Sequence, residues 1–216
     1  MNKLADFTLI LDCSSSMTSI WSSTINGINS LIAKQLKAQG KLVFSVLTFS
    51  SVIQWVRIAT PIQNVARVGE HEFQLRQGTR LLDAFGEAIT STEERISKAH
   101  SSNPPRVLIA VMTDGLENAS RNYSGGQVAK MILEKRRSGW EFLFFGAKQD
   151  ASKSAVRLGI PSSSAMNFVC TDESATKVTD LLNREIIKFS SGEATGFFPA
   201  VEDPGADPAG DTGCGT

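Results

Sequence analysis

Five oxygen-bearing side chains in three separate segments have the chemistry of a metal site. The first three alternate directly after an apolar run, the fourth precedes an amphipathic segment, and the fifth follows a second apolar run. We expect an extended loop after the first run, in which the three alternating residues present their oxygens to one side. Carboxylate and hydroxyl oxygens are hard ligands that favour Mg²⁺ or Mn²⁺, allow Ca²⁺ and disfavour zinc. The five candidate ligands of one divalent cation are Asp12, Ser14, Ser16, Thr79 and Asp114.

The ratio of charged to neutral ligands predicts what such a cation binds. Asp12 and Asp114 together balance the charge of a divalent ion, and the remaining three ligands are neutral hydroxyls. Five side chains do not complete an octahedral shell, so an outside carboxylate can bind the open position. We therefore expect a partner protein that presents an Asp or Glu side chain.

A simpler interpretation exists for each residue taken alone. Serines such as Ser14 and Ser16 often cap helix N-termini, and so does a threonine such as Thr79. The dipeptide Asp114-Gly115 is typical of a turn after a strand. The metal site is favoured because it explains all of these residues together.

The elements that position these residues follow from hydrophobic periodicity. Short apolar runs alternate with segments in which apolar residues recur every three or four positions, which indicates strands alternating with amphipathic helices. The expected strands are 7–12, 42–49, 52–58, 107–112, 141–145 and 166–170, and the expected helices are 19–39, 82–96, 126–137, 150–158 and 178–189.

This alternation predicts an α/β fold with a three-layer, doubly wound, mainly parallel sheet of the Rossmann-like type. Only Ser50-Ser51 separates the strands 42–49 and 52–58, so the second of them is expected to be an antiparallel edge strand. In a parallel sheet, ligands bind at the carboxyl ends of the strands. The candidate metal ligands are expected at this edge.

The length of 216 residues suits one domain, which we place at 1–190. The remaining segment, 191–216, is rich in Gly and Pro, is acidic and contains no Lys or Arg. Such a composition cannot bury a core, so we expect a disordered tail.

Charge and cysteine content exclude several classes of partner and compartment. The 22 basic residues are balanced by 22 acidic ones, which gives no basic excess for binding nucleic acid. No apolar run approaches the roughly 20 residues that cross a bilayer. No secretion leader is visible, and three cysteines at irregular spacing fit neither a disulfide framework nor a zinc site. We expect a cytoplasmic protein without membrane or nucleic-acid partners.

At the candidate ligands the sequence resembles the von Willebrand factor A family. The metal-ion-dependent adhesion site of that family has the pattern Asp-x-Ser-x-Ser, a distant Thr and a distant Asp. Three segments carry the resemblance in the family's order: 7–17 (FTLILDCSSSM), 78–89 (GTRLLDAFGEAI) and 111–120 (VMTDGLENAS). The resemblance spans about residues 5–190. It implies that the same five residues form the metal site and that the chain is similar to stand-alone bacterial or phage members.

The leading functional hypothesis is a metal-dependent protein-interaction module that engages an acidic group on a partner. One alternative is a Mg²⁺-dependent phosphoester hydrolase, but the sequence has no Asp-x-Asp nucleophile pair, Gly-rich phosphate loop or placed His base, so we expect no enzymatic activity. A second alternative is a structural or assembly protein that keeps the fold without metal.

Overall fold

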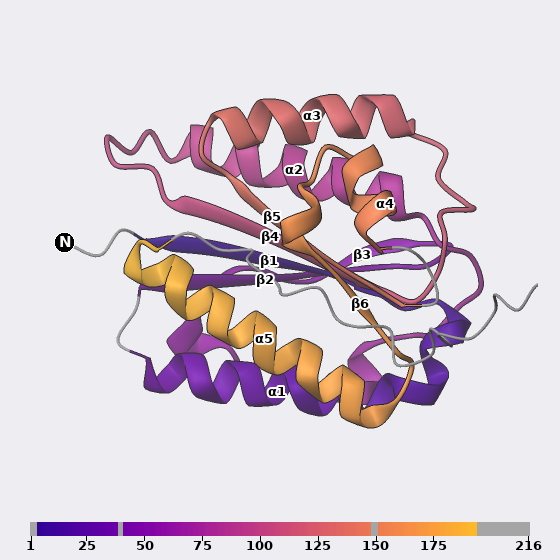
Figure 1. Cartoon of the computed structure of the whole chain (residues 1–216). Helices are drawn as coiled ribbons and strands as arrows, with labels where there is room; N and C mark the ends of the chain where they lie inside the picture. Colours follow the sequence, from indigo (N-terminus) through magenta and orange to yellow (C-terminus); the bar gives the residue numbers. More distant parts are fainter. Residues whose placement is uncertain (1–3, 39–40, 148–150, 194–216) are drawn as a thin grey trace, which may run out of the picture.

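A central sheet lies between two layers of helices in the computed structural model, which describes residues 4–38, 41–147 and 151–193 (Figure 1). The strands are β1 (Ala5–Asp12), β2 (Leu42–Phe49), β3 (Ile53–Pro61), β4 (Arg106–Thr113), β5 (Glu141–Ala147) and β6 (Ala165–Phe168). The α-helices are α1 (Trp21–Lys37), α2 (Leu81–Lys98), α3 (Gly125–Arg137), α4 (Ala151–Arg157) and α5 (Asp172–Ser191).

The sheet has the strand order β3-β2-β1-β4-β5-β6. Neighbouring strands are parallel except at one edge, where β3 runs antiparallel to β2. The predicted three-layer fold and its antiparallel edge strand are therefore confirmed. Several strand ends differ from the expectation by one to three residues; for example, β3 continues to Pro61 and β6 already ends at Phe168.

Both faces of the sheet are buried, because helices cover each of them. Phe7, Leu9 and Leu11 of β1 belong to a hydrophobic core shared with α1 and α5. Ile10, which points to the opposite face, belongs to a second core shared with α2, α3 and α4. All eight residues of β1 are buried. The strand that ends in Asp12 is thus held from both sides.

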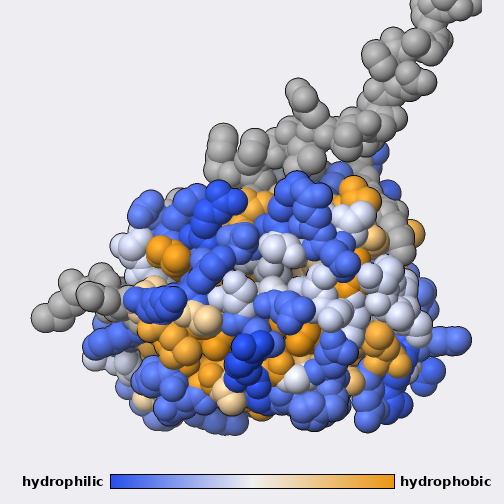
Figure 2. Space-filling view, turned by 90° about the horizontal axis from the view of Figure 1, so that it is seen from below, coloured by the Kyte–Doolittle hydropathy of each residue, from blue (hydrophilic) through white to orange (hydrophobic). Residues whose placement is uncertain are grey.

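The outer surface of the α1 and α5 layer is mainly hydrophilic, with several separate apolar patches (Figure 2). Leu36 of α1 and Ile187 of α5 are 48% and 41% exposed. Leu36 continues the three-and-four spacing of the buried residues of α1, but it is part of neither core. Periodicity identifies the face of a helix that meets the sheet and does not show where that contact ends.

Two further sequence expectations concern the C-terminal segment and membrane-spanning helices. The acidic segment 191–216 lies outside them except for 191–193, so its predicted disorder stays a prediction. Within the described ranges, no helix combines the length and the hydropathy needed to cross a bilayer.

The close approach of α1 and α5 generates a test of the packing. A Cβ added at Gly27 of α1 would overlap the side chain of Thr179 on α5. Gly27→Ala is expected to lower the free energy of unfolding by about 1–2 kcal/mol, because overpacking outweighs the gain in helix propensity. Urea denaturation measures the change. Gly126→Ala, where a Cβ meets nothing within 4 Å, is the matched control; equal stability of both variants would contradict the packing shown.

Candidate metal centre

The candidate ligands gather at the carboxyl edge of the sheet, where the sequence analysis expected them. Asp12 is the last residue of β1, and Asp114 directly follows β4. These strands are parallel neighbours, with Leu11 paired to Met112. Two strands that were distant in sequence therefore bring their terminal carboxylates to the same place.

A continuous chain of hydrogen bonds joins four of the five residues. The backbone N–H of Ser14 donates to Asp12 Oδ1 at 2.7 Å, and the hydroxyls of Ser14 and Ser16 are 2.9 Å apart. The Ser16 hydroxyl donates to Asp114 Oδ1 at 2.5 Å. Four of the residues predicted to bind one cation are thus linked by hydrogen bonds.

The fifth residue, Thr79, reaches the cluster beside Gly115. A Cβ added at Gly115 would lie 3.1 Å from Thr79 Oγ1 and 3.7 Å from Asp12 Oδ2. Both oxygens therefore flank the same small space, which the absence of a side chain on Gly115 leaves open. All five predicted residues are brought together.

The cluster is buried except for one member. Asp12, Ser14, Thr79 and Asp114 are each at most 4% exposed, whereas Ser16 is on the surface. Burial raises the pKa of Asp12, the charge of Asp114 raises it further, and hydrogen bonds from Thr113 and Ser14 oppose both effects. Two buried carboxylates that repel each other form an environment that a cation stabilises.

The loop after β1 differs from the expected extended conformation. Ser15 begins a 3₁₀ helix, η1 (Ser15–Ile20), and the backbone N–H of Met17 donates to Ser14 O at 3.0 Å. The side chain of Met17 is fully buried, which favours this tight turn. The assumption of an extended loop was wrong, although the hydroxyls of Ser14 and Ser16 still meet.

The capping interpretation does not describe these residues. Ser14 occupies the N-cap of η1, but its side chain makes no capping hydrogen bond. Arg80, and not Thr79, occupies the N-cap of α2. Their hydroxyls are thus available to the cluster.

Sequence reasoning missed two side chains that contact the carboxylates. Thr113 donates from Oγ1 to Asp12 Oδ2 at 2.5 Å and accepts from the Gly115 backbone N–H at 3.2 Å. The Cys170 thiol lies 3.9 Å from Asp114 Oδ2. Both residues stand at the carboxyl ends of strands, and this position is the only sequence signal that points to them.

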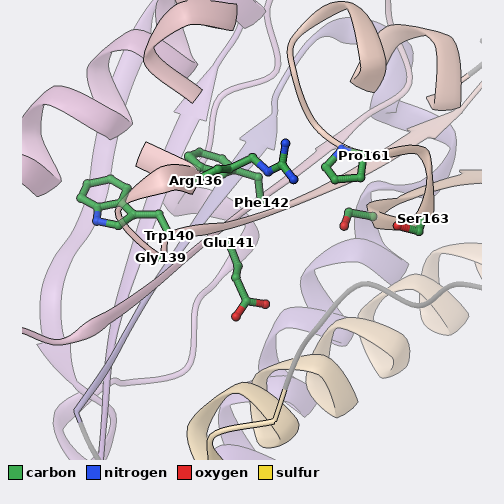
Figure 3. Close-up of a pocket in the computed structure, with 8 residues that line it drawn as sticks. Arg136, Gly139, Trp140, Glu141, Phe142, Pro161 and Ser163 are labelled. Carbon is green, nitrogen blue, oxygen red and sulfur yellow. The ribbon is translucent and has the colours of Figure 1, made fainter. Parts of the chain in front are cut away.

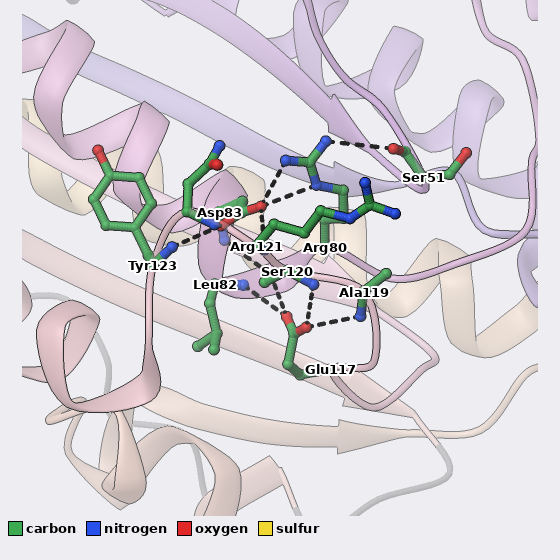
Figure 4. A network of polar contacts seen from close by, with 10 residues as sticks. Ser51, Arg80, Leu82, Asp83, Glu117, Ala119, Ser120, Arg121 and Tyr123 are labelled. Carbon is green, nitrogen blue, oxygen red and sulfur yellow. Dashed lines mark hydrogen bonds and ion pairs between the residues drawn. The ribbon is translucent and has the colours of Figure 1, made fainter.

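Glu117 attaches the loop after β4 to the start of α2 (Figure 4). One carboxylate oxygen accepts the backbone N–H of Leu82 at 2.9 Å, and the other accepts the N–H groups of Ala119 and Ser120. The first N–H groups of a helix lack partners within the helix, so an acidic side chain there is favourable. The loop that carries Asp114 is therefore fixed next to Thr79.

Asp83 fixes the following part of the same loop (Figure 4). It accepts the Arg80 guanidinium, and it also accepts three backbone N–H groups, those of Arg121, Asn122 and Tyr123. Burial alone would raise the pKa of Asp83, but these donors together hold it below its usual value.

A third segment supports the cluster from the other side. Arg76 donates its backbone N–H to Cys13 O and accepts the Ser15 N–H, both at 2.9 Å. The side chain of Arg76 is exposed, as is that of Arg121 on the loop after β4. Basic side chains therefore stand on two of the loops next to the acidic cluster.

Other potential ligand sites are less suited to a metal. Within the residues that the structure describes, no three His, Cys, Asp or Glu side chains gather in a group that could hold a metal ion. A cavity of about 360 Å³ lies beside Trp140 and Glu141, at the start of β5, and its lining includes Arg136 and Pro161 (Figure 3). It is at the sheet edge opposite to the cluster.

Comparisons with known proteins identify the family and the fold. The family model for the von Willebrand factor type A domain matches residues 6–184. A search of curated proteins found no match.

Several solved structures share the fold. They include proximal thread matrix protein 1 from the mussel byssus with a zinc-occupied MIDAS motif (TM-score 0.60, 14% identity, 86% of this chain and 46% of that one). The pilus adhesin SpaC from Lactobacillus rhamnosus GG gives a TM-score of 0.68 at 12% identity over 87% of this chain and 30% of that one. The vWF domain of the type V pili tip protein Mfa5 from Porphyromonas gingivalis gives a TM-score of 0.59 at 10% identity, over 85% of this chain and 96% of that one. The chain spans less than half of the mussel protein.

The contacts of Asp83 predict a pH-dependent effect on stability. Because the pKa of Asp83 is lowered on folding, its contribution is present above the unfolded pKa of about 3.9 and is lost as the pH falls through the lower folded pKa. Asp83→Asn should destabilise the domain by roughly 1–3 kcal/mol at pH 7 and by less at pH 3. Urea denaturation at both pH values tests this. The control is Asp180→Asn, which changes an exposed ion pair with Lys34. A loss of stability in Asp83→Asn that is the same at both pH values would refute the electrostatic role of Asp83.

Proposed function

Since the chain belongs to the von Willebrand factor type A domain family, we propose that it is a metal-dependent protein-interaction module. The observation that carries this proposal is the meeting of Asp12 and Asp114 with three hydroxyl residues at one edge of the sheet. In this function the domain binds a divalent cation there, and the cation engages an acidic group on a partner protein.

The donor set fits the proposed cation. Two carboxylates supply the charge, and hydroxyl oxygens supply hard neutral ligands, a combination suited to Mg²⁺, to Mn²⁺ and also to Ca²⁺. The mussel byssus protein is described with zinc in its MIDAS motif. We assign Mg²⁺ here because no nitrogen ligand is part of the cluster. The residues that would hold the ion are Asp12, Ser14, Ser16, Thr79 and Asp114.

The surroundings of the cluster support an acidic partner. A bound cation supplies a positive centre that accepts a carboxylate, and five ligand residues that each bind through one oxygen leave one position of an octahedral shell open. Ser16 lies at the exposed rim, which leaves the partner a route of approach. The exposed side chains of Arg76 and Arg121 add positive charge around that route, which favours association with an acidic surface.

Exposed apolar residues at the same edge support a protein partner over a small anion. Leu116 follows β4, Val169 follows β6 and Val52 lies in the β2–β3 hairpin, and they are 64%, 60% and 43% exposed. All three follow the carboxyl ends of parallel strands. Exposed apolar side chains of this kind supply apolar area that a protein interface can bury, which a small anion would not use.

We propose that this module is not an enzyme. His71 lies beside Gly69, and His100 lies beyond the C-terminal end of α2. Neither residue is part of the hydrogen-bonded cluster formed by the carboxylates, so neither is placed as a general base there.

The proposed setting is a reducing cytoplasm. Cys13 and Cys170 carry thiols in the structure, and Cys170 lies against the Asp114 carboxylate. Cys13 is buried, and burial raises the pKa of its thiol far above the usual range. A protonated, buried thiol is an inert packing group.

Metal binding is tested by isothermal titration calorimetry with MgCl₂ and MnCl₂. We expect one site in the unmodified protein and an affinity at least about tenfold weaker in Asp12→Asn, which removes a ligand's negative charge, and in Ser14→Ala, which removes a ligand oxygen. Asp180→Asn makes the same charge change at an exposed position and should bind normally. Circular dichroism checks folding. Unaltered affinity in folded Asp12→Asn would rule out the assigned centre.

Partner chemistry is tested on the Mn²⁺-loaded protein by water-proton relaxation. The peptide Ac-Gly-Asp-Gly-NH₂ should displace metal-bound water and lower the relaxation enhancement, whereas Ac-Gly-Asn-Gly-NH₂ should not, because an amide is a much weaker ligand for a hard cation. Arg121→Ala should weaken the response to the acidic peptide by roughly two- to fivefold, as expected for an exposed charge. Equal responses to both peptides would contradict recognition of a carboxylate.

A further inference from the structure

A second cavity, of about 380 Å³, lies between edge strand β3, helix α2 and the loop that precedes α3. Its lining includes Trp55, Arg80, Asp83, Glu87 and Tyr123. The volume is within the range of pockets that bind small groups. None of these residues belongs to the proposed metal centre.

The charges in this cavity do not cancel. Asp83 and Glu87 are one turn apart on α2, so both face the cavity. Asp83 is neutralised by Arg80, whose Nε and terminal N–H groups donate to Asp83 Oδ2 at 2.9 and 2.7 Å. The remaining terminal nitrogen of Arg80 donates to Ser51 O at 3.4 Å. The positive charge of Arg80 is therefore already paired.

Glu87 provides the uncompensated charge. Its Oε1 accepts the indole N–H of Trp55 at 2.9 Å, and its side chain is half-buried. In the described part of the chain, no lysine or arginine forms an ion pair with Glu87. In the described residues, the Glu87 carboxylate thus accepts a hydrogen bond from the neutral indole of Trp55 and forms no ion pair with a basic side chain.

Two aromatic side chains stand beside this carboxylate. Trp55 is oriented by its bond to Glu87, and Tyr123 packs directly over Gly86, where any Cβ would overlap the phenol ring. The Tyr123 hydroxyl also lies 3.5 Å from Thr90 Oγ1. The rings line the pocket and are held in place by α2 before any ligand binds (Tyr123 is shown in Figure 4).

We propose that this pocket binds the side chain of a lysine or arginine on a partner protein. Electron-rich rings attract a cation, and Glu87 supplies the opposite charge. An anion would be repelled by Glu87, and an apolar side chain would remove water from that carboxylate without replacing it. A cation is the ligand that satisfies both features.

The site lies close to the proposed metal centre but does not depend on it. Arg80 directly follows Thr79 in the chain, and the hairpin that carries Ser51 joins β2 to β3. A partner that presents an acidic group to the metal would therefore find this cation pocket nearby. The basic side chain binds through residues of β3, α2 and the loop before α3 only, so its binding requires no metal.

The test uses the indole N–H resonance of Trp55 in EDTA, assigned by its loss in Trp55→Phe. We expect Ac-Gly-Arg-Gly-NH₂ and Ac-Gly-Lys-Gly-NH₂ to produce saturable shifts, and the uncharged citrulline peptide to bind about tenfold more weakly. Glu87→Gln should lower the affinity for the arginine peptide to that of the citrulline peptide. Glu94→Gln, an exposed position on the same helix, should leave it unchanged.

Three results would overturn the proposal: no shift with either basic peptide, equal affinity for the arginine and citrulline peptides, or undiminished arginine binding in Glu87→Gln. Resonances away from the pocket show whether the variants are folded. Because EDTA is present throughout, failure of the metal proposal leaves this measurement unaffected, and failure here leaves the calorimetric test of metal binding unaffected.

Discussion

Two buried carboxylates at the ends of neighbouring parallel strands are the constraint on which the rest of this edge depends. Asp12 and Asp114 lie almost fully out of water, and burial together with the charge of Asp114 raises the pKa of Asp12. Hydrogen bonds from Ser14, Ser16 and Thr113 offset part of that cost. In the proposed function a divalent cation would offset the remainder, which links the burial of the two acids to that function.

The loops around the carboxylates are fixed by further acidic side chains that bind backbone N–H groups. Glu117 and Asp83 together accept six backbone N–H groups, from residues 82 and 119–123. These contacts join the loop after β4 to the first turn of α2, so Asp114 and Thr79 are held together by the same structure. Preorganised ligands lose less entropy when a metal binds than mobile ones do.

The fold and the five candidate ligands could be predicted because both follow from local patterns. Parallel strands place their carboxyl ends at one edge whatever the strand order is, so Asp12 and Asp114 were assigned to one site without knowing that β1 and β4 are neighbours. The contact between Trp55 and Glu87 could not be predicted in this way, because it depends on which helix packs beside the edge strand β3. The 3₁₀ turn at Ser15 depends on the burial of Met17, which no local pattern shows.

The most direct test of the central claim is anomalous X-ray diffraction from crystals grown with Mn²⁺. We predict one strong manganese peak among the five candidate ligands. This peak should be lost in crystals of Asp12→Asn grown under the same conditions. A fully occupied manganese site elsewhere on the molecule, or no peak in this cluster at a Mn²⁺ concentration that saturates the protein in solution, would contradict the claim. The oxygens that should surround the ion belong to Asp12, Ser14, Ser16, Thr79 and Asp114.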